Sequence, residues 1–356
     1  MIYTDEDMFE GNLKNRYNPF FKPDFSPDFL RSNNYIGNFA VISTSLINKI
    51  GKFRKEFDAV REYDLYLRIM EKTNNIIHIP NVLYHVRKTE VIKDNTEQLG
   101  KEVIQDHLNR LKIAYHDIKS TKQLGLNLYH IKYKIKGNPL ISIIIPNKDS
   151  IKYLNRAVKS ILLQSNYKNY EIIIVENNSK NRKTFKYYDK ISKNNKIKIV
   201  YYKDKVFNYS AINNYAVNYA KGEYILLLNN DIEIINKEWL EEMLSICQRE
   251  DVGVVGAKLL YKDNLVQHIG VIVGMGGIAG HVDKMIKDSE IGYHGRAVVV
   301  NNYSAVTAAC LMTKKELYKR VNGLDERFKV AFNDIDFCMK IRKENKFFNE
   351  CYKRKM

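Results

Sequence analysis

Residues 222–234 read Gly-Glu-Tyr-Ile-Leu-Leu-Leu-Asn-Asn-Asp-Ile-Glu-Ile and contain the most informative pattern of the chain. The apolar run 224–228 has no polar alternation, which predicts a short strand that is buried on both faces. Asn229, Asn230 and Asp231 end this run, so we expect Asp231 at the strand end, where open α/β sheets bind ligands. A carboxylate there can share Mg²⁺ or Mn²⁺ with substrate phosphates. The alternative is that the three residues form only a turn that closes the strand.

The segment that begins at Pro139 alternates apolar runs with amphipathic stretches. The predicted strands, which lack polar alternation, are 141–145, 171–175 and 197–202. The predicted helices, which carry an apolar stripe, are 150–162 and 208–219. This alternation predicts an α/β fold with a mainly parallel sheet and flanking crossover helices. Three strands end in polar clusters, so we expect Asn147, Glu176 and Asp231 to line one crevice.

The composition fits a globular protein with more than one unit. The chain has 356 residues, of which 45% are hydrophobic, enough for two cores. It shows no apolar run of membrane-spanning length and no signal-peptide pattern at the N-terminus, so we expect a cytoplasmic protein. The four cysteines form no Cys-x-x-Cys motif, which predicts reduced thiols and no structural zinc.

The formal net charge of +17 raises the question of an anionic partner. Lysine is spread along the whole chain, and no basic block with interleaved aromatic residues is typical of an RNA-binding face. We therefore predict a solvated surface and no nucleic-acid partner. Peripheral attraction to the anionic inner face of the cell membrane is the alternative use of this charge.

Two stretches, 51–69 and 323–341, resemble one another. Each begins with Gly, passes through a Phe, and continues with two acidic residues two positions apart and an apolar helical pattern. Asp5-Glu6-Asp7 precedes the first copy as residues 229–231 precede the second. A pattern that occurs only twice predicts a repeated domain and not a solenoid. The predicted divisions are a partial first domain (1–94), a helical connector and linker (95–138), and a second domain (139–356).

At this point the chain resembles the family 2 glycosyltransferases, which have the GT-A fold and build bacterial O-antigen, capsule and related glycans. The segments that carry the resemblance, which together cover most of the family's motifs, are 141–146, 171–179, 207–214, 229–231, 304–310 and 333–334. The chain is most similar to rhamnosyltransferase-like members. Asn229 stands at the first position of the family's Asp-x-Asp motif, which leaves Asp231 as the expected metal ligand.

The resemblance implies inverting transfer of a sugar from a nucleotide-diphosphate donor to a hydroxyl of a growing cell-surface or lipid-linked glycan. It implies Mn²⁺ or Mg²⁺ on Asp231 and Asn229, and Asp334 as general base. The residues it assigns to nucleotide binding are Pro146, Asn147, Glu176, Asn178, Asn208, Asn214 and Asn230. Glu176 and Asp334 have a second interpretation as helix or turn caps, and the asparagines as turn formers. His268 and His281 are assigned no site role.

The resemblance also implies that the first copy starts at its metal strand and that the second stops soon after its base. Metal-like and base-like side chains remain in the first copy at Asp5, Asp7, Glu62 and His85. Because no counterpart of Asn147 precedes Asp5, we expect one donor site per chain. The alternative function is an impaired remnant that binds nucleotide or partner transferases without turnover.

Overall fold

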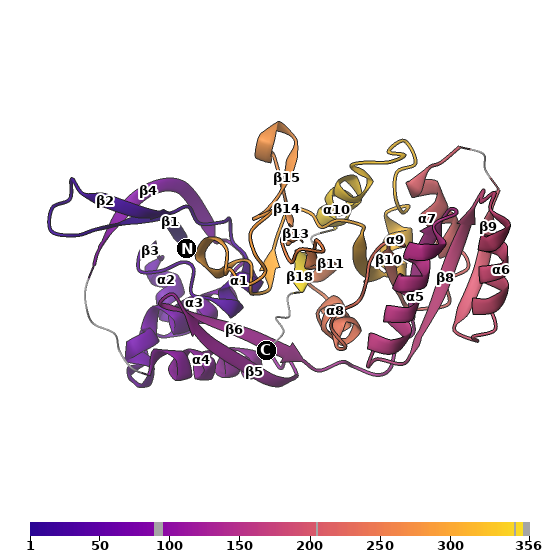
Figure 1. The fold of residues 1–356 in the computed structure, drawn as a ribbon. Coiled ribbons are helices and arrows are strands. Elements are labelled where there is room, and N and C mark those ends of the chain that lie inside the picture. Colours follow the sequence, from indigo (N-terminus) through magenta and orange to yellow (C-terminus); the bar gives the residue numbers. More distant parts are fainter. Residues whose placement is uncertain (89–94, 204–205, 345–346, 352–356) are drawn as a thin grey trace. The chain divides into compact units, whose positions relative to one another are not determined.

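The computed structural model describes residues 1–88, 95–203, 206–344 and 347–351. The chain forms two compact units. The first contains residues 1–134 and 291–302, and the second contains residues 135–290 and 303–356. Figure 1 labels the elements of both. This division differs from the predicted one, because the segment 95–134 belongs to the first unit and does not form a connector.

The reason is visible in helix α4 (Thr96–Arg110), which packs against α3 (Arg61–Met70). Its apolar stripe is fully buried at Val103, Ile104 and Leu108. The helical part of the predicted connector (95–138) is confined to α4. It ends at Arg110, and the chain continues into a hairpin of β5 (Tyr115–Gln123) and β6 (Leu126–Tyr133).

The sheet of the first unit is built around β1 (Ile2–Phe9). Strands β2 (Arg16–Phe20) and β3 (Ala40–Val41) pair with it antiparallel, and β4 (Ile77–Arg87) pairs with it in parallel. The remaining short elements of this unit are α1 (Pro27–Ser32), α2 (Thr44–Ile50), η1 (Lys55–Val60), η3 (Tyr293–Gly295) and β16 (Asn301–Asn302). Gly51 ends α2 with φ 84°, a conformation that glycine adopts readily.

Residues 291–302 join the first unit through a contact that sequence does not reveal. The Asn302 side chain accepts a hydrogen bond from Asp28 N at 2.9 Å and donates one to Asp28 Oδ2 at 2.9 Å. The two residues are 274 positions apart. Such a pairing depends on the tertiary fold, and no local sequence pattern predicts it.

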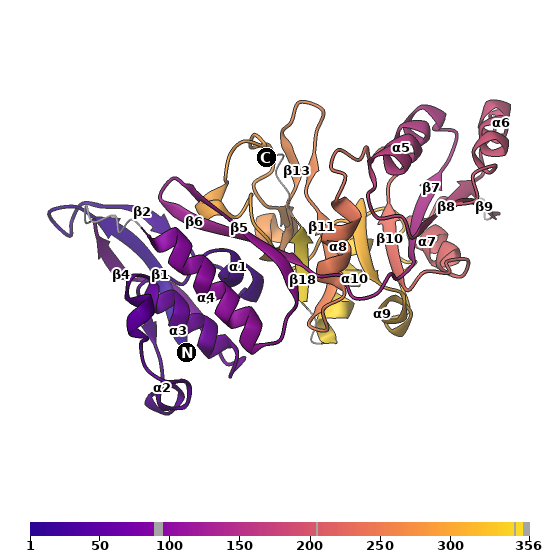
Figure 2. The same cartoon turned by 90° about the horizontal axis from the view of Figure 1, so that it is seen from below.

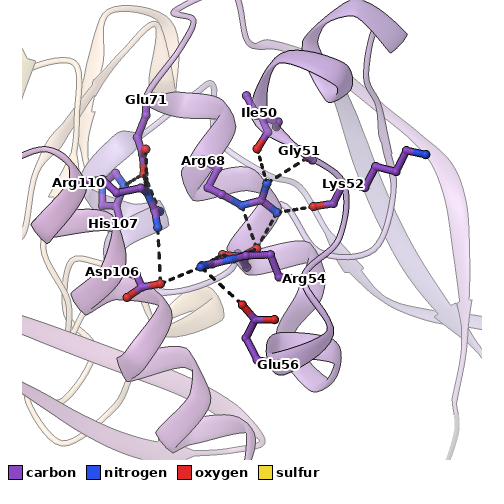
Figure 3. Close-up of polar contacts among 11 residues, drawn as sticks. Ile50, Gly51, Lys52, Arg54, Glu56, Arg68, Glu71, Asp106, His107 and Arg110 are labelled. Atoms are coloured by element: carbon purple, nitrogen blue, oxygen red, sulfur yellow. Dashed lines mark hydrogen bonds and ion pairs between the residues drawn. The ribbon is translucent and has the colours of Figure 1, made fainter.

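A buried ionic cluster ties α3 to α4 (Figure 3). Asp64 is fully buried and accepts hydrogen bonds from Arg54 and Arg68. Burial alone would raise the pKa of Asp64, but the hydrogen bonds from the two guanidinium groups lower it below the usual range. Arg54 also donates to Asp106 of α4 at 2.9 Å, so one arginine connects both helices.

The sheet of the second unit has the strand order β18-β11-β17-β10-β7-β8-β9. Strands β10, β7, β8 and β9 are parallel, and β17 pairs antiparallel with β10 and β11. The predicted α/β class with a mainly parallel sheet is confirmed. The bounds are β7 (Ile141–Asn147), β8 (Tyr170–Asn177), β9 (Ile197–Tyr202), β10 (Tyr224–Leu228), β11 (Val252–Ala257), β17 (Cys310–Lys314) and β18 (Phe347–Cys351).

Helices flank this sheet, with β9 at its edge and α6 beside it in both views (Figures 1 and 2). Their bounds are α5 (Ile151–Gln164), α6 (Arg182–Ile191), α7 (Tyr209–Val217), α8 (Trp239–Cys247), α9 (Lys315–Arg320) and α10 (Asn333–Lys343). The sequence pattern does not predict α6, because this helix buries only Thr184 and Tyr188. Asn208 caps α7 by accepting from Ala211 N at 3.1 Å, whereas Ser150 makes no side-chain cap to α5.

The helix predicted over 208–219 ends at Val217, so Gly222 does not cap it. Gly222 lies instead against β7, where a Cβ atom would come within 2.6 Å of Leu140 O. The position therefore needs glycine for close backbone approach.

The rest of the second unit consists of short strands and one 3₁₀ turn. These are β12 (Leu259–Leu260), β13 (Val266–His268), β14 (Val271–Val273), η2 (Met275–Gly277) and β15 (Ala279–His281). The glycine-rich segment 274–277 forms the tip between the paired strands β14 and β15. Over the described part of the chain, no helix combines the length and apolar character required to cross a bilayer.

Candidate functional site

A cavity of about 410 Å³ opens in the second unit, where β7, β8 and β10 end. Its lining includes polar residues from all three strand ends and from the start of α10. The predicted site residues that line it are Pro146, Asn147, Asn229, Asn230, Asp231 and Asp334. These six residues, which the sequence analysis assigns to one site, therefore line one cavity in the fold, although they lie up to 188 positions apart in the chain.

The strand pairing explains the arrangement. Because β7 and β10 are parallel neighbours, with Ile144 opposite Leu227, Asn147 and Asn230 emerge side by side. Asn230 Nδ2 donates to Asn147 Oδ1 at 2.8 Å. On the other side of β10, Asn229 N donates to Ala309 O at 3.0 Å. The polar end of β10 is thus fixed to strands on both sides.

Asp231 differs from its neighbours in having no protein partner. Its residue is exposed, and among the described residues no group donates a hydrogen bond or forms an ion pair with its carboxylate. A carboxylate with free lone pairs at a cavity wall is available to an external cation. The described residues contain no cluster of three or more His, Cys, Asp or Glu that could hold a metal by itself. The donor set therefore fits a cation that Asp231 shares with ligand oxygens.

Glu176 does not line the cavity. The residue is 3% exposed, and its carboxylate accepts hydrogen bonds from Ser179 Oγ at 2.7 Å and from Tyr188 OH at 2.7 Å. Burial, together with this carboxylate, raises the pKa of Tyr188, so its hydroxyl stays protonated and donates. Tyr188 OH accepts in turn from Asn147 Nδ2 at 2.8 Å. Glu176 thus contacts the cavity through Tyr188 and Asn147, and its predicted contact with nucleotide stays a prediction.

Three predicted asparagines also lie outside the cavity lining. Asn208 caps α7 and donates to Glu326 O at 2.9 Å. Asn214 Oδ1 accepts from Tyr318 OH at 2.6 Å, which joins α7 to α9. Asn178 has φ 56° and donates to the cavity residue Asn177 at 3.0 Å. The hydrogen bonds of Asn208 and Asn214 are structural contacts within the fold, and the nucleotide contacts predicted for these two residues stay a prediction.

Asp334 is the second residue of α10 and lines the cavity. Oδ2 accepts from Ala308 N at 3.2 Å, and Oδ1 accepts from Ile335 N at 2.9 Å. Phe332, with φ 63°, precedes the helix in the left-handed region and turns the chain into it. The carboxylate is therefore held in place by two backbone donors while remaining part of the wall.

Two aromatic residues of the cavity were not predicted individually. Tyr209 OH donates to Ala308 O at 3.0 Å, and burial raises the pKa of this phenol. Phe207 is 47% exposed and adds apolar surface to the lining. Both fall in the segment 207–214 that carries the family resemblance, which is the signal that could have found them.

A histidine pair lies behind the cavity residue Thr307. Thr307 N donates to His268 Nε2 at 3.3 Å, so this nitrogen is the unprotonated one. His268 Nδ1 then carries the proton and donates to His281 Nδ1 at 2.8 Å. Burial and the nearby His281 lower the pKa of His268 to about 3, so it is neutral near neutral pH. The pKa of His281 is lowered by burial and by Lys284, against the opposing effect of Asp334. Sequence left both histidines without a role.

The carboxylates predicted for the first copy all have hydrogen-bond partners in neighbouring residues. Asp5 Oδ1 lies 2.7 Å from His78 Nε2 and also accepts from Lys22 N. Asp7 Oδ1 lies 2.5 Å from His85 Nδ1, and Glu62 accepts from Arg61. These contacts contrast with the unpartnered carboxylate of Asp231.

The comparison with protein families identifies the domain that contains the cavity. Residues 142–274 match the model described as glycosyl transferase family 2. The chain carries a family 2 glycosyltransferase domain. This family 2 domain includes the ends of β7, β8 and β10, and with the strand order it agrees with the GT-A fold that the sequence predicts.

Two relatives match almost the whole chain. One is the uncharacterized protein y4gI of Sinorhizobium fredii, 38% identical over 359 residues. The other is the O-antigen biosynthesis protein RfbC of Myxococcus xanthus, 36% identical over 349 residues. Each alignment covers 96% of this chain, but only 38% of y4gI and 27% of RfbC. The chain therefore spans well under half the length of these relatives.

Solved structures show more distant likeness. GalNAc-T7 with UDP, GalNAc and Mn²⁺ gives a TM-score of 0.49 at 11% identity, over 73% of this chain and 52% of that one. The mannosyltransferase PcManGT from Pyrobaculum calidifontis, in complex with GDP-Man and Mn²⁺, gives 0.45 at 12% identity, over 71% and 63%.

Proposed function

We propose that the family 2 domain transfers a sugar, with inversion, from a nucleotide-diphosphate donor to a hydroxyl group of a glycan acceptor. The observation that carries the proposal is the pairing of two different carboxylates in one cavity. Asp231 is exposed and unpartnered within the described chain, whereas Asp334 is held by two backbone donors. This is the arrangement that a metal-assisted leaving group and a general base require.

In the proposed reaction the acceptor oxygen attacks the anomeric carbon as the bond from that carbon to the diphosphate breaks. Asp334 takes the acceptor proton, and its bonds from Ala308 N and Ile335 N keep the carboxylate in position. Asp231, with Asn229 beside it, would hold Mn²⁺ or Mg²⁺. A divalent cation, when bound, neutralises charge on the leaving diphosphate.

The nucleotide is proposed to lie along Pro146, Asn147 and Asn230. Asn147 is 3% exposed and is fixed by Tyr188 and Asn230, so its orientation is set before a ligand arrives. In this proposal Glu176 is a positioning residue that acts through Tyr188.

The acceptor is proposed to be a growing cell-surface or lipid-linked glycan, with the protein in the cytoplasm at the inner face of the membrane. The name of the relative RfbC, an O-antigen biosynthesis protein, supports this class of acceptor.

Calorimetry with UDP and dTDP, with and without Mn²⁺, tests the proposal. Asp231→Asn is expected to weaken Mn²⁺-dependent binding by about 2–3 kcal/mol, the scale of a lost charge-assisted contact. Asp189→Asn, which removes an exposed carboxylate from α6, is the matched control and should leave binding unchanged. Equal binding by Asp231→Asn and the original chain would refute the assignment. Binding without hydrolysis of any nucleotide sugar in a panel would instead favour the non-catalytic alternative.

A further inference from the structure

The basic residues of the second unit are not spread evenly. Between Lys180 and Lys203 the chain carries nine Lys and Arg and one acidic residue, Asp189, a net charge of +8. The whole chain has 58 basic and 41 acidic residues, so this short segment holds almost half of the net charge of +17. The even distribution inferred from the sequence does not describe this region.

The fold places this charge on one exposed edge. Helix α6 buries Thr184 and Tyr188, which turns Arg182, Lys183, Lys186 and Lys190 to solvent. Lys193 and Lys198 follow in the turn before β9 and in β9 itself, the last strand of the sheet order. We call these six residues the basic edge. Figures 1 and 2 both show α6 beside β9.

The charge of the basic edge is not neutralised internally. Within the ranges that the structure describes, none of its six side chains forms an ion pair with a carboxylate. Six like charges held close together repel one another, so the edge lowers its free energy when it meets an anionic surface.

The aromatic residues around the basic edge argue against stacking of nucleic-acid bases. Lys198 Nζ lies over the ring of Tyr219 at 4.9 Å, and Lys196 Nζ lies over Tyr170 at 4.0 Å. Phe185 packs edge-on against Tyr188. Single-stranded nucleic acids need free aromatic faces and a groove that follows the backbone, and the rings of Tyr170 and Tyr219 each already have an ammonium group over one face.

We propose that the basic edge docks the protein peripherally on an anionic lipid bilayer. A helix face beside an edge strand presents its cations to a broad surface, and a bilayer with anionic headgroups needs only such an array. Phe185, 36% exposed between Lys183 and Lys186, adds an aromatic side chain at the headgroup level. This inference depends on the charge of α6 and β9 and not on the chemistry of the cavity.

Vesicle sedimentation with the full chain tests the inference. The protein should bind vesicles of phosphatidylglycerol mixed with phosphatidylcholine, and not vesicles of phosphatidylcholine alone. Replacing Lys183, Lys186 and Lys190 with Gln should weaken the partition coefficient about 100-fold, which corresponds to about 1 kcal/mol per cation. Binding should also fall in about 1 M salt, where the Debye length is about 3 Å.

A matched variant separates the basic edge from net charge. Lys14, Lys49 and Lys72 are exposed in the first unit, and their replacement with Gln removes the same charge. This control should bind vesicles like the original chain. Equal weakening in both triple variants, no binding to anionic vesicles, or a stronger effect of the α6 variant on oligonucleotide binding than on vesicle binding would overturn the inference. Mn²⁺-dependent UDP binding by the α6 variant, measured in parallel, reports on the proposed function separately.

Discussion

His268 gives the structure a pH dependence that can be calculated and measured. It is fully buried, its Nε2 accepts from Thr307 N, and its pKa is lowered to about 3, chiefly by burial and then by His281. In the unfolded chain its pKa is close to 6.5. Between these two values the unfolded state binds a proton that the folded state does not, so the free energy of unfolding falls as the pH falls.

The magnitude follows from the difference in pKa. At about 1.36 kcal/mol per pH unit below 6.5, His268 should remove about 2 kcal/mol of stability between about pH 7 and pH 5. The variant His268→Gln keeps a hydrogen-bond acceptor for Thr307 N but cannot titrate. We therefore expect this variant to lose about 2 kcal/mol less than the original chain over the same interval.

Urea unfolding followed by tryptophan fluorescence reports on the second unit, which contains His268. The chain has one tryptophan, Trp239, which is 8% exposed in α8 and donates to Ser165 Oγ at 2.9 Å. His116→Gln, an exposed histidine of β5 in the first unit, is the control and should leave this transition unchanged. If His268→Gln kept the full pH dependence, His268 would not be a buried neutral histidine and the hydrogen-bond chain through His281 would be refuted.

Three further outcomes follow from the site. Asp334→Asn should leave Mn²⁺-dependent UDP binding intact and slow sugar transfer by roughly 10²- to 10⁴-fold, and joint loss of both would point to a structural cap. Glu176→Gln should lower the free energy of unfolding by about 1–3 kcal/mol in the Trp239 transition, because Ser179 or Tyr188 loses its acceptor; an unchanged urea midpoint would contradict the network. Calorimetry should give one nucleotide per chain, since the carboxylates of Asp5 and Asp7 are already partnered, and a site that survives Asp231→Asn would contradict this.

The parallel sheet and the cavity could be predicted because local patterns encode them. Unbroken apolar runs such as 224–228 are explained by burial on both faces, and the polar residues after them mark the strand ends. Since parallel strands end at the same edge, sequence alone places Asn147 and Asp231 in one crevice.

The missed features depend on contacts between distant segments. The partner of Glu176 is Tyr188, on a helix whose apolar stripe is too narrow to be read from sequence. The pairing of Asn302 with Asp28 crosses 274 residues. The pair of His268 and His281 joins two short strands, β13 and β15, and no spacing rule predicts it. In each case the side chain is interpretable only when its partner is known.

The hydrogen-bond partners of the carboxylates separate structural roles from chemical ones. Glu176 is buried and accepts hydrogen bonds from Ser179 and Tyr188, so its carboxylate is used within the fold. Asp334 meets two backbone donors at the cavity wall, which fixes its position and leaves capacity to accept a proton. Asp231 meets no donor among the described residues, so its charge is compensated only by solvent or by a bound cation. A carboxylate that the fold leaves unsatisfied beside a cavity is the one best suited to exchange water for a metal ion and its diphosphate.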